Sequence, residues 1–80
     1  MELGKNAVVI SRMGHDAGRV YVVTARVNED FVLVVDGKHR KLDNPKLKRV
    51  KHVKPVGESD VLDRVKTDTE LHKALRNFGL

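Results

Sequence analysis

The segment that decides the fold is residues 19–36, RVYVVTARVNEDFVLVVD. Its apolar residues are mostly valine, joined by Tyr21 and Phe31, and branched and aromatic side chains suit a pleated, half-buried strand. The polar link Asn28-Glu29-Asp30 between the two apolar runs is typical of a tight hairpin turn. The segment therefore predicts two antiparallel strands, at about 19–27 and 31–36.

Three further short strands are expected around this hairpin. The run Ala7-Val8-Val9-Ile10-Ser11 predicts a strand at 7–11. Asp36-Gly37 indicates a turn, because glycine accepts positive φ, and we expect strands at 38–42 and 49–53 after it. Pro45 cannot donate to a sheet ladder and marks a loop or edge between these two. Five short strands in about 50 residues favour a small, strongly bent barrel.

The central strands are apolar on both faces, although alternation normally leaves one face polar. A barrel this small has room inside for only one of these faces, so the other needs a cover. The C-terminal segment is the favoured cover. A homodimer, a partner surface or simple exposure of a few valines are the alternatives.

Composition changes at Pro55-Val56-Gly57, which predicts a β domain at 1–55 and a helical tail at 56–80, packed on the barrel or on a partner. Thr67-Asp68-Thr69-Glu70 has the form of a helix capping box. One group of apolar residues at helical spacing follows this capping box and another precedes it, which predicts one bent helix or two short ones. These groups are Leu71, Ala74, Leu75 and Phe78, with Gly79 as the stop, and Val61, Leu62 and Val65.

The charge distribution is the first indication of function. Sixteen Lys and Arg against eleven Asp and Glu give a net charge of +5 and a pI near 9.8, which is typical of nucleic-acid binders, although solubility alone would also account for it. Residues 38–54 hold eight of these cations and a single acid, Asp43, a net charge of +7. The rest of the chain therefore sums to −2.

Other classes of protein find little support in the sequence. Eighty residues form one small domain, and the absence of cysteine excludes disulfides and thiol chemistry. No apolar run approaches the ~20 residues of a membrane span, and the first residues lack a signal-peptide pattern, so we expect a soluble, cytoplasmic protein that binds no membrane. Ser11 and Ser59 lack a nucleophile setting, and four scattered histidines have no metal-ligand spacing. We therefore expect no catalytic residues, no metal and no cofactor.

A family resemblance emerges along the first two thirds of the chain. Asn6-Ala7-Val8-Val9-Ile10-Ser11, leading into Arg12-Met13-Gly14-His15-Asp16-Ala17-Gly18-Arg19-Val20-Tyr21, resembles a KOW motif, in which two strands and a glycine-containing loop form half of an SH3-like barrel. With Asp36-Gly37-Lys38 and Asn44-Pro45-Lys46-x-Lys48-x-x-Lys51-His52, residues 2–54 resemble short bacterial KOW-domain proteins. Those are similar to an archaeal and eukaryotic large-subunit ribosomal protein family, number fourteen in the eukaryotic series. Ala17 departs from the lysine frequent in this loop, and the helical tail lies outside the shared pattern.

The resemblance implies a mainly β, SH3-like (KOW) five-stranded barrel with a C-terminal helical extension, and binding to structured ribosomal RNA. Read from the residues, Gly14 and Gly18 permit a close turn, and Arg12 and Arg19 flank it as phosphate ligands or as solvated surface. His15 and Asp16 are expected to share a local hydrogen bond. The predicted RNA-contacting residues are Arg12, Gly14, His15, Arg19, Lys38, Arg40, Lys41, Lys46, Lys48, Arg49 and Lys51.

Within this set the best phosphate ligands are Lys46, Lys48, Arg49 and Lys51, with 46 and 48 pointing one way and 49 and 51 the other. Only three aromatic residues are present, and we expect all of them to pack, which disfavours a base-stacking sheet and favours recognition of RNA shape. The alternative is an SH3-like protein-interaction module of the translation or transcription machinery, docking through the apolar strand face or the C-terminal helix. No helix-turn-helix or zinc pattern supports reading of DNA sequence.

Overall fold

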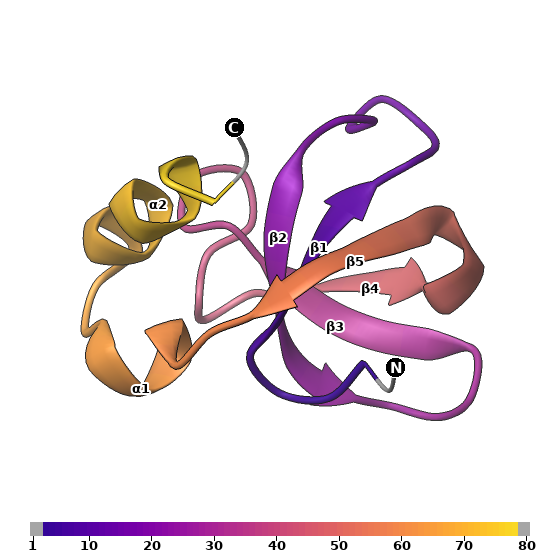
Figure 1. Cartoon of the computed structure of the whole chain (residues 1–80), viewed down its shortest axis with the longest axis horizontal. Coiled ribbons are helices and arrows are strands. Elements are labelled where there is room, and N and C mark those ends of the chain that lie inside the picture. The colour runs from indigo at the N-terminus through magenta and orange to yellow at the C-terminus, as the bar shows by residue number, and fades with distance from the viewer. Residues whose placement is uncertain (1–2, 79–80) are drawn as a thin grey trace.

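Five antiparallel strands form one bent sheet, and two short helices pack on one of its faces (Figure 1). The computed structural model describes residues 3–78. In chain order the elements are β1 (Ala7–Ser11), β2 (Val20–Arg26), β3 (Phe31–Val35), β4 (Lys46–Arg49), the 3-10 turn η1 (Val50–His52), β5 (Val53–Glu58), α1 (Val61–Arg64) and α2 (Asp68–Arg76). The prediction of a mainly β chain with a C-terminal helical segment is confirmed.

The order of strands in the sheet is β4-β3-β2-β1-β5. β2 and β3 form the predicted hairpin, with Val23 opposite Val34, and β1 pairs with both β2 and β5. Within residues 3–78 the two edge strands, β4 and β5, form no ladder with each other, so the sheet is not closed and the expected barrel is not confirmed. The turn η1 carries the chain from one edge to the other (Figure 1).

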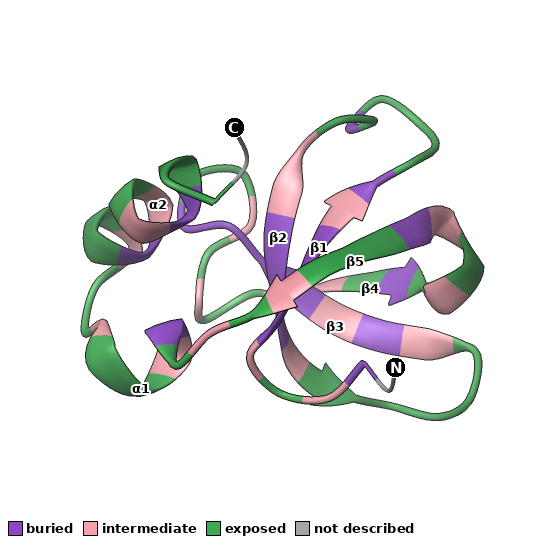
Figure 2. Ribbon diagram, viewed as in Figure 1, coloured by how far each residue is buried: buried purple, intermediate pink, exposed green. Residues whose placement is uncertain are grey.

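The central strands β1, β2 and β3 carry buried residues on both faces, which belong to two apolar clusters. The edge strands β4 and β5 are mostly exposed or half-buried (Figure 2). Strand alternation sends Val9, Tyr21 and Val23 to the first face and Val8 and Val22 to the second. The second cluster is completed by Val61 of α1 and by Leu71 and Leu75 of α2, all at most 3% exposed. Burying each such side chain contributes about 1.5–3 kcal/mol, so the helices are the cover that the doubly apolar strands require.

The predicted strand at 38–42 is wrong, and the predicted strand at 49–53 is interrupted by η1 at Val50–His52. The loop at 38–42 is explained by Asp36. One carboxylate oxygen of Asp36 accepts hydrogen bonds from the backbone N–H groups of Lys38, His39 and Arg40, at 3.0, 2.8 and 2.8 Å. These bonds fold the chain into a loop and remove the donors that a ladder would need. The fourth strand starts only at Lys46, and the fifth runs over 53–58.

The 36–45 loop is held against α2 by two contacts. Gly37 has φ +79°, and a Cβ atom at this position would overlap the backbone carbonyl oxygen of Asp68. The Asp68 carboxylate accepts a hydrogen bond of 2.7 Å from the backbone N–H of Leu42. The glycine is therefore required both by its conformation and by the close approach of the helix.

The C-terminal segment forms two short helices, and the predicted capping box is confirmed. The Thr67 hydroxyl accepts from the Glu70 backbone N–H at 3.2 Å, and the Glu70 carboxylate accepts from the Thr67 backbone N–H at 3.1 Å. α2 ends at Arg76, and the predicted stop at Gly79 lies outside the described residues. None of the helices within 3–78 has the length and apolar character needed to cross a membrane.

Candidate nucleic-acid interface

The loop between β1 and β2, residues 12–19, is a compact turn with an exposed outer surface. Gly14 and Gly18 both have φ +89°, and an added Cβ would find ordinary contact at Gly14 and open space at Gly18. Backbone conformation therefore explains both glycines. The side chains of Arg12, Met13 and His15 are exposed around this turn.

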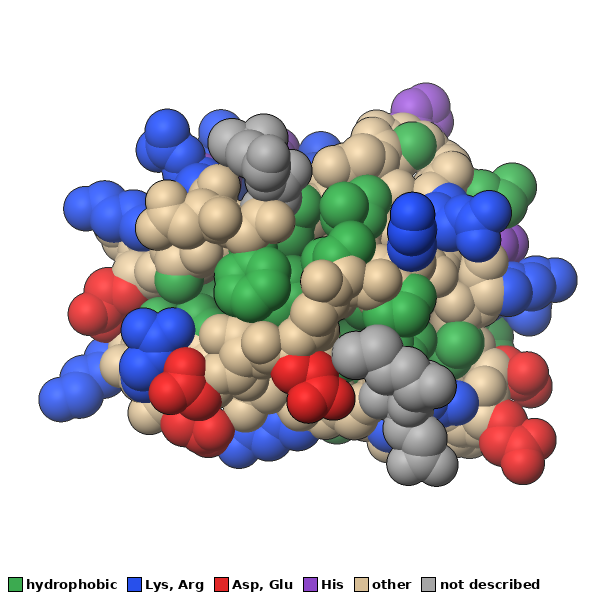
Figure 3. All heavy atoms as spheres, in the orientation of Figure 1, with side chains coloured by type: hydrophobic (Ala, Val, Ile, Leu, Met, Phe, Trp, Pro, Cys, Tyr) green, Lys and Arg blue, Asp and Glu red, His purple; other side chains and the backbone are tan. Residues whose placement is uncertain are grey.

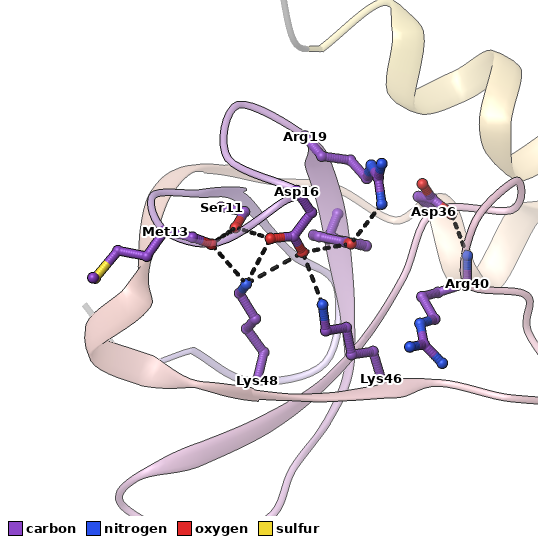
Figure 4. Close-up of polar contacts among 9 residues, drawn as sticks. Ser11, Met13, Asp16, Arg19, Asp36, Arg40, Lys46 and Lys48 are labelled. Atoms are coloured by element: carbon purple, nitrogen blue, oxygen red, sulfur yellow. Dashed lines mark hydrogen bonds and ion pairs between the residues drawn. The ribbon is translucent and has the colours of Figure 1, made fainter.

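A buried carboxylate fixes the loop to the sheet. Asp16 is 4% exposed, and its two oxygens accept hydrogen bonds from Ser11 (2.9 Å), Lys48 (2.9 Å), Tyr21 (2.8 Å) and Lys46 (3.2 Å) (Figure 4). The Lys48 ammonium also donates to the carbonyl oxygen of Met13, at 3.4 Å. The loop and β4 therefore meet through one polar network.

The network stabilises the charged form of Asp16 and the neutral form of Tyr21. Burial alone would raise the pKa of Asp16, but the hydrogen bonds from Lys48, Tyr21, Ser11 and Lys46 outweigh burial and hold that pKa far below its usual range. Burial, and then the hydrogen bond to Asp16, raise the pKa of Tyr21 to about 12. At neutral pH the tyrosine is therefore a permanent donor to a permanent carboxylate.

The network engages the two lysines of β4, which the sequence predicted to be phosphate ligands. Lys46 and Lys48 point the same way, as predicted, but into the network. The Lys48 side chain is 8% exposed, whereas the Lys46 side chain is 31% exposed. The ammonium of Lys48 is thus engaged by the protein itself and is not free for a phosphate. The expected bond between His15 and Asp16 is also wrong, since Asp16 turns inward and the His15 side chain faces solvent.

The other predicted cations are exposed or half-buried, and none of them is paired with an acid among residues 3–78. Within residues 3–78 the ion pairs are Lys5–Asp63, Lys46–Asp16, Lys48–Asp16 and Arg64–Asp60. Arg19 and Arg40 are half-buried. The exposed members of the predicted set are Arg12, Lys38, Lys41, Arg49 and Lys51, and Lys54 on β5, which the prediction counted in the basic segment but omitted from the site, is exposed too.

Two aromatic side chains deviate from the prediction that all three pack in the core. Tyr21 is fully buried, as expected, but Phe31 is half-buried with the Arg49 guanidinium 4.9 Å above its ring. Phe78 is 39% exposed, because it follows the end of α2 and lies against Gly57 of β5. Hydrophobic side chains gather where β5 crosses the face in Figure 3, with Lys and Arg side chains around them.

The residues described do not form a metal centre: no three metal-ligating side chains cluster anywhere between residues 3 and 78. Fold and surface instead define a class, a small basic β domain in which a glycine-containing loop is pinned beside a strand edge rich in cations. Over all 80 residues the chain is 30% identical to the large ribosomal subunit protein eL14 of Staphylothermus marinus, and it covers 81% of that protein. The chain belongs to the eL14 family of ribosomal proteins. No protein-family model matches it.

The predicted relationship to the large-subunit family numbered fourteen is therefore confirmed. The KOW motif and the likeness to short bacterial proteins stay predictions.

Proposed function

We propose that this chain is a cytoplasmic ribosomal protein that binds structured ribosomal RNA through its exposed cations and its KOW-type loop, and that it is not an enzyme. The observation that carries the proposal is the separation of the cations into two groups. Lys46 and Lys48 form ion pairs with Asp16, whereas the surrounding basic side chains are exposed or half-exposed without acidic partners among residues 3–78. Unpaired cations at this density favour a polyanion as partner.

The mechanism is electrostatic capture on a preformed surface. Asp16 holds the 12–19 loop against β4, so Arg12, Gly14 and His15 are presented in a fixed position. The phosphate ligands that we assign from the exposed and half-buried cations are Arg12, Arg19, Lys38, Arg40, Lys41, Arg49, Lys51 and Lys54. Phosphate contacts carry no sequence information, so the shape of the folded RNA supplies the specificity. The relative is a large ribosomal subunit protein, which supports ribosomal RNA as that RNA.

Fluorescence anisotropy across salt concentrations tests the proposal. If four to six cations meet phosphates, the log–log salt slope is about −3 to −5, at roughly 0.7–0.9 per contact. Structured ribosomal RNA fragments should bind more tightly than single strands and duplex DNA. No binding at low salt would overturn the proposal.

A matched pair of variants locates the surface. Lys41→Glu with Lys51→Glu reverses two charges in the basic segment, and Lys66→Glu with Lys73→Glu makes the same change near α2; all four side chains are exposed. The first pair should weaken binding more and flatten the salt slope by about two contacts. Equal losses in the two pairs would mean that net charge alone, and not the 38–54 segment, directs binding.

A protein-docking role is the second candidate, favoured by one observation. α1 and α2 cover the strand face that a docking partner would use in the alternative prediction, which leaves Val56 and Phe78, each 39% exposed, as the apolar surface near β5. If Val56→Lys abolished co-purification of a ribosomal protein while RNA affinity was unchanged, this surface would be a protein contact. An unchanged set of co-purified proteins would remove the candidate.

A further inference from the structure

A cleft lies between the end of α2, the start of β2 and the loop after β3. It has a volume of about 260 Å³ and is lined by residues of these elements. Arg19, Lys38 and Arg76 supply its cations, and Val20 and Leu75 supply apolar surface. Figure 4 shows Arg19 and Asp36 on the same side of the polar network. Because Arg19 belongs to the KOW-type loop and Lys38 to the basic segment, the cleft continues the proposed RNA surface.

The charge of the cleft favours an anionic ligand. Three cations face one acid, Asp36, for a formal charge of +2 with the histidines neutral. One oxygen of the Asp36 carboxylate already accepts three backbone hydrogen bonds from the loop. Among residues 3–78 Asp36 forms no ion pair, so the cations of the cleft are not tied to it.

Flat rings stand beside these charges. His39 comes from the loop and His72 from α2, and both histidines line the cleft together with Val20 and Leu75. Imidazole rings and guanidinium planes are among the side chains on which unpaired RNA bases stack. A cleft of this size lies just below the ~300 Å³ at which pockets for whole drug-sized ligands begin, so it suits a single base.

The walls are fixed before any ligand arrives. Gly37 lies against the backbone of Asp68 and His72, and Leu42 is hydrogen-bonded to the Asp68 carboxylate. These contacts hold the loop that carries Lys38 and His39 against the helix that carries His72 and Arg76. A preformed site avoids the entropy cost of ordering its side chains on binding.

We propose that this cleft binds one unpaired nucleotide of an RNA, with the base against the two imidazoles and the apolar floor, and its phosphates on Arg19, Lys38 and Arg76. The proposal rests on the proposed RNA-binding function and names a subsite of that surface. It also gives α2 a role beyond covering the sheet, because the helix supplies two of the polar side chains of the cleft. Paired bases inside an A-form helix cannot enter such a cleft, so the ligand is a bulged or looped-out nucleotide.

Three RNA hairpins of equal length test the idea by anisotropy at low salt. One carries a single-nucleotide bulge, the second the same bulge with an abasic residue, and the third is fully paired. We expect the first to bind about tenfold more tightly than the other two, within the range that stacking of one base provides. Tight but equal binding of all three hairpins would refute the nucleotide site in the cleft but would still support the RNA-binding function. No binding of any hairpin would overturn both.

Matched variants place the effect in the cleft. His39→Ala removes an exposed ring from the loop, and Arg76→Glu reverses a rim charge; each should reduce the preference for the bulge to less than about threefold, because base stacking or phosphate pairing is lost. Lys73→Glu makes the same charge change on an exposed position of α2 that does not line the cleft, and it should retain the preference. Circular dichroism confirms folding of each variant. If all three variants kept the preference, the bulge would be read elsewhere and the proposal would be wrong.

Discussion

Replacing Lys48 by methionine tests whether this cation stabilises the fold or binds RNA. The substitution removes the ammonium that donates to Asp16 at 2.9 Å but keeps an unbranched side chain of similar length on β4. It leaves a carboxylate that is 4% exposed with Lys46 as its remaining cationic neighbour among the described residues. We expect a clear loss of stability, with RNA binding intact in the fraction that stays folded.

The size of the loss follows from burial and from the partners that remain. Removing one member of a buried ion pair costs about 3–5 kcal/mol. Asp16 keeps its hydrogen bonds from Ser11, Tyr21 and Lys46, so we expect the lower end of this range, about 3 kcal/mol. A chain of 80 residues has a total stability of about 4–12 kcal/mol, so the loss is a large fraction of it.

Urea unfolding followed by far-ultraviolet circular dichroism measures the change. Lys46→Met should cost about 1 kcal/mol or less, because its side chain is 31% exposed and Lys48 stays in place. Lys41→Met removes the same charge from an exposed position and should stay within about 0.5 kcal/mol of the parent protein. Under folding conditions, the salt slope of RNA binding should be unchanged in Lys48→Met.

Two results would refute this reasoning. A stability of Lys48→Met within about 0.5 kcal/mol of Lys41→Met would mean that the buried pair contributes little. A salt slope reduced by about one contact would mean that Lys48 meets a phosphate, and that it leaves Asp16 when RNA binds.

Two further predictions concern the same framework. Because the folded pKa of Asp16 lies below its ordinary value of 3.8, its contribution to stability is present above about pH 4 and is lost as the pH falls through the folded pKa. Asp16→Asn should therefore reduce the loss of unfolding free energy on acidification, measured from pH 7 to pH 2. An unchanged pH dependence in this variant would contradict the lowered pKa of Asp16. Gly37→Ala should lower stability by about 2 kcal/mol or more in a thermal melt, against about 1 kcal/mol for Gly18→Ala, which shares the positive φ but meets no neighbour; equal costs would mean that the close approach of α2 is not rigid.

Local patterns predicted most of the fold. The valine-rich runs indicated β1, β2 and β3 because strand chemistry repeats within a few residues. The capping box at Thr67 depends on residues three apart, and the structure confirms it. The need for a cover over the second sheet face followed from the apolar alternation alone, and α1 and α2 provide that cover.

Distant contacts decided what the sequence could not reveal. Asp36-Gly37 is a turn signal of the right kind, but the position of the loop against α2 depends on contacts with Asp68, far along the chain. The inward position of the Lys48 ammonium likewise depends on Asp16, 32 residues earlier. No periodicity links such positions, because the chain must fold before they meet.

The alternation of β4 shows why its charges fall into two groups. Along Lys46-Leu47-Lys48-Arg49 the lysines face inward, opposite the core residues Val34 and Val32, while Leu47 is 53% exposed and Arg49 is exposed beside it. Hydrophobic patterning alone would favour the reverse register, with Leu47 inside. In that register Asp16 would lose both ammonium groups, and an unpaired buried carboxylate costs more than one exposed leucine. The buried acid on the loop therefore selects the register of β4, and that register turns Arg49 outward, where it is available to a phosphate.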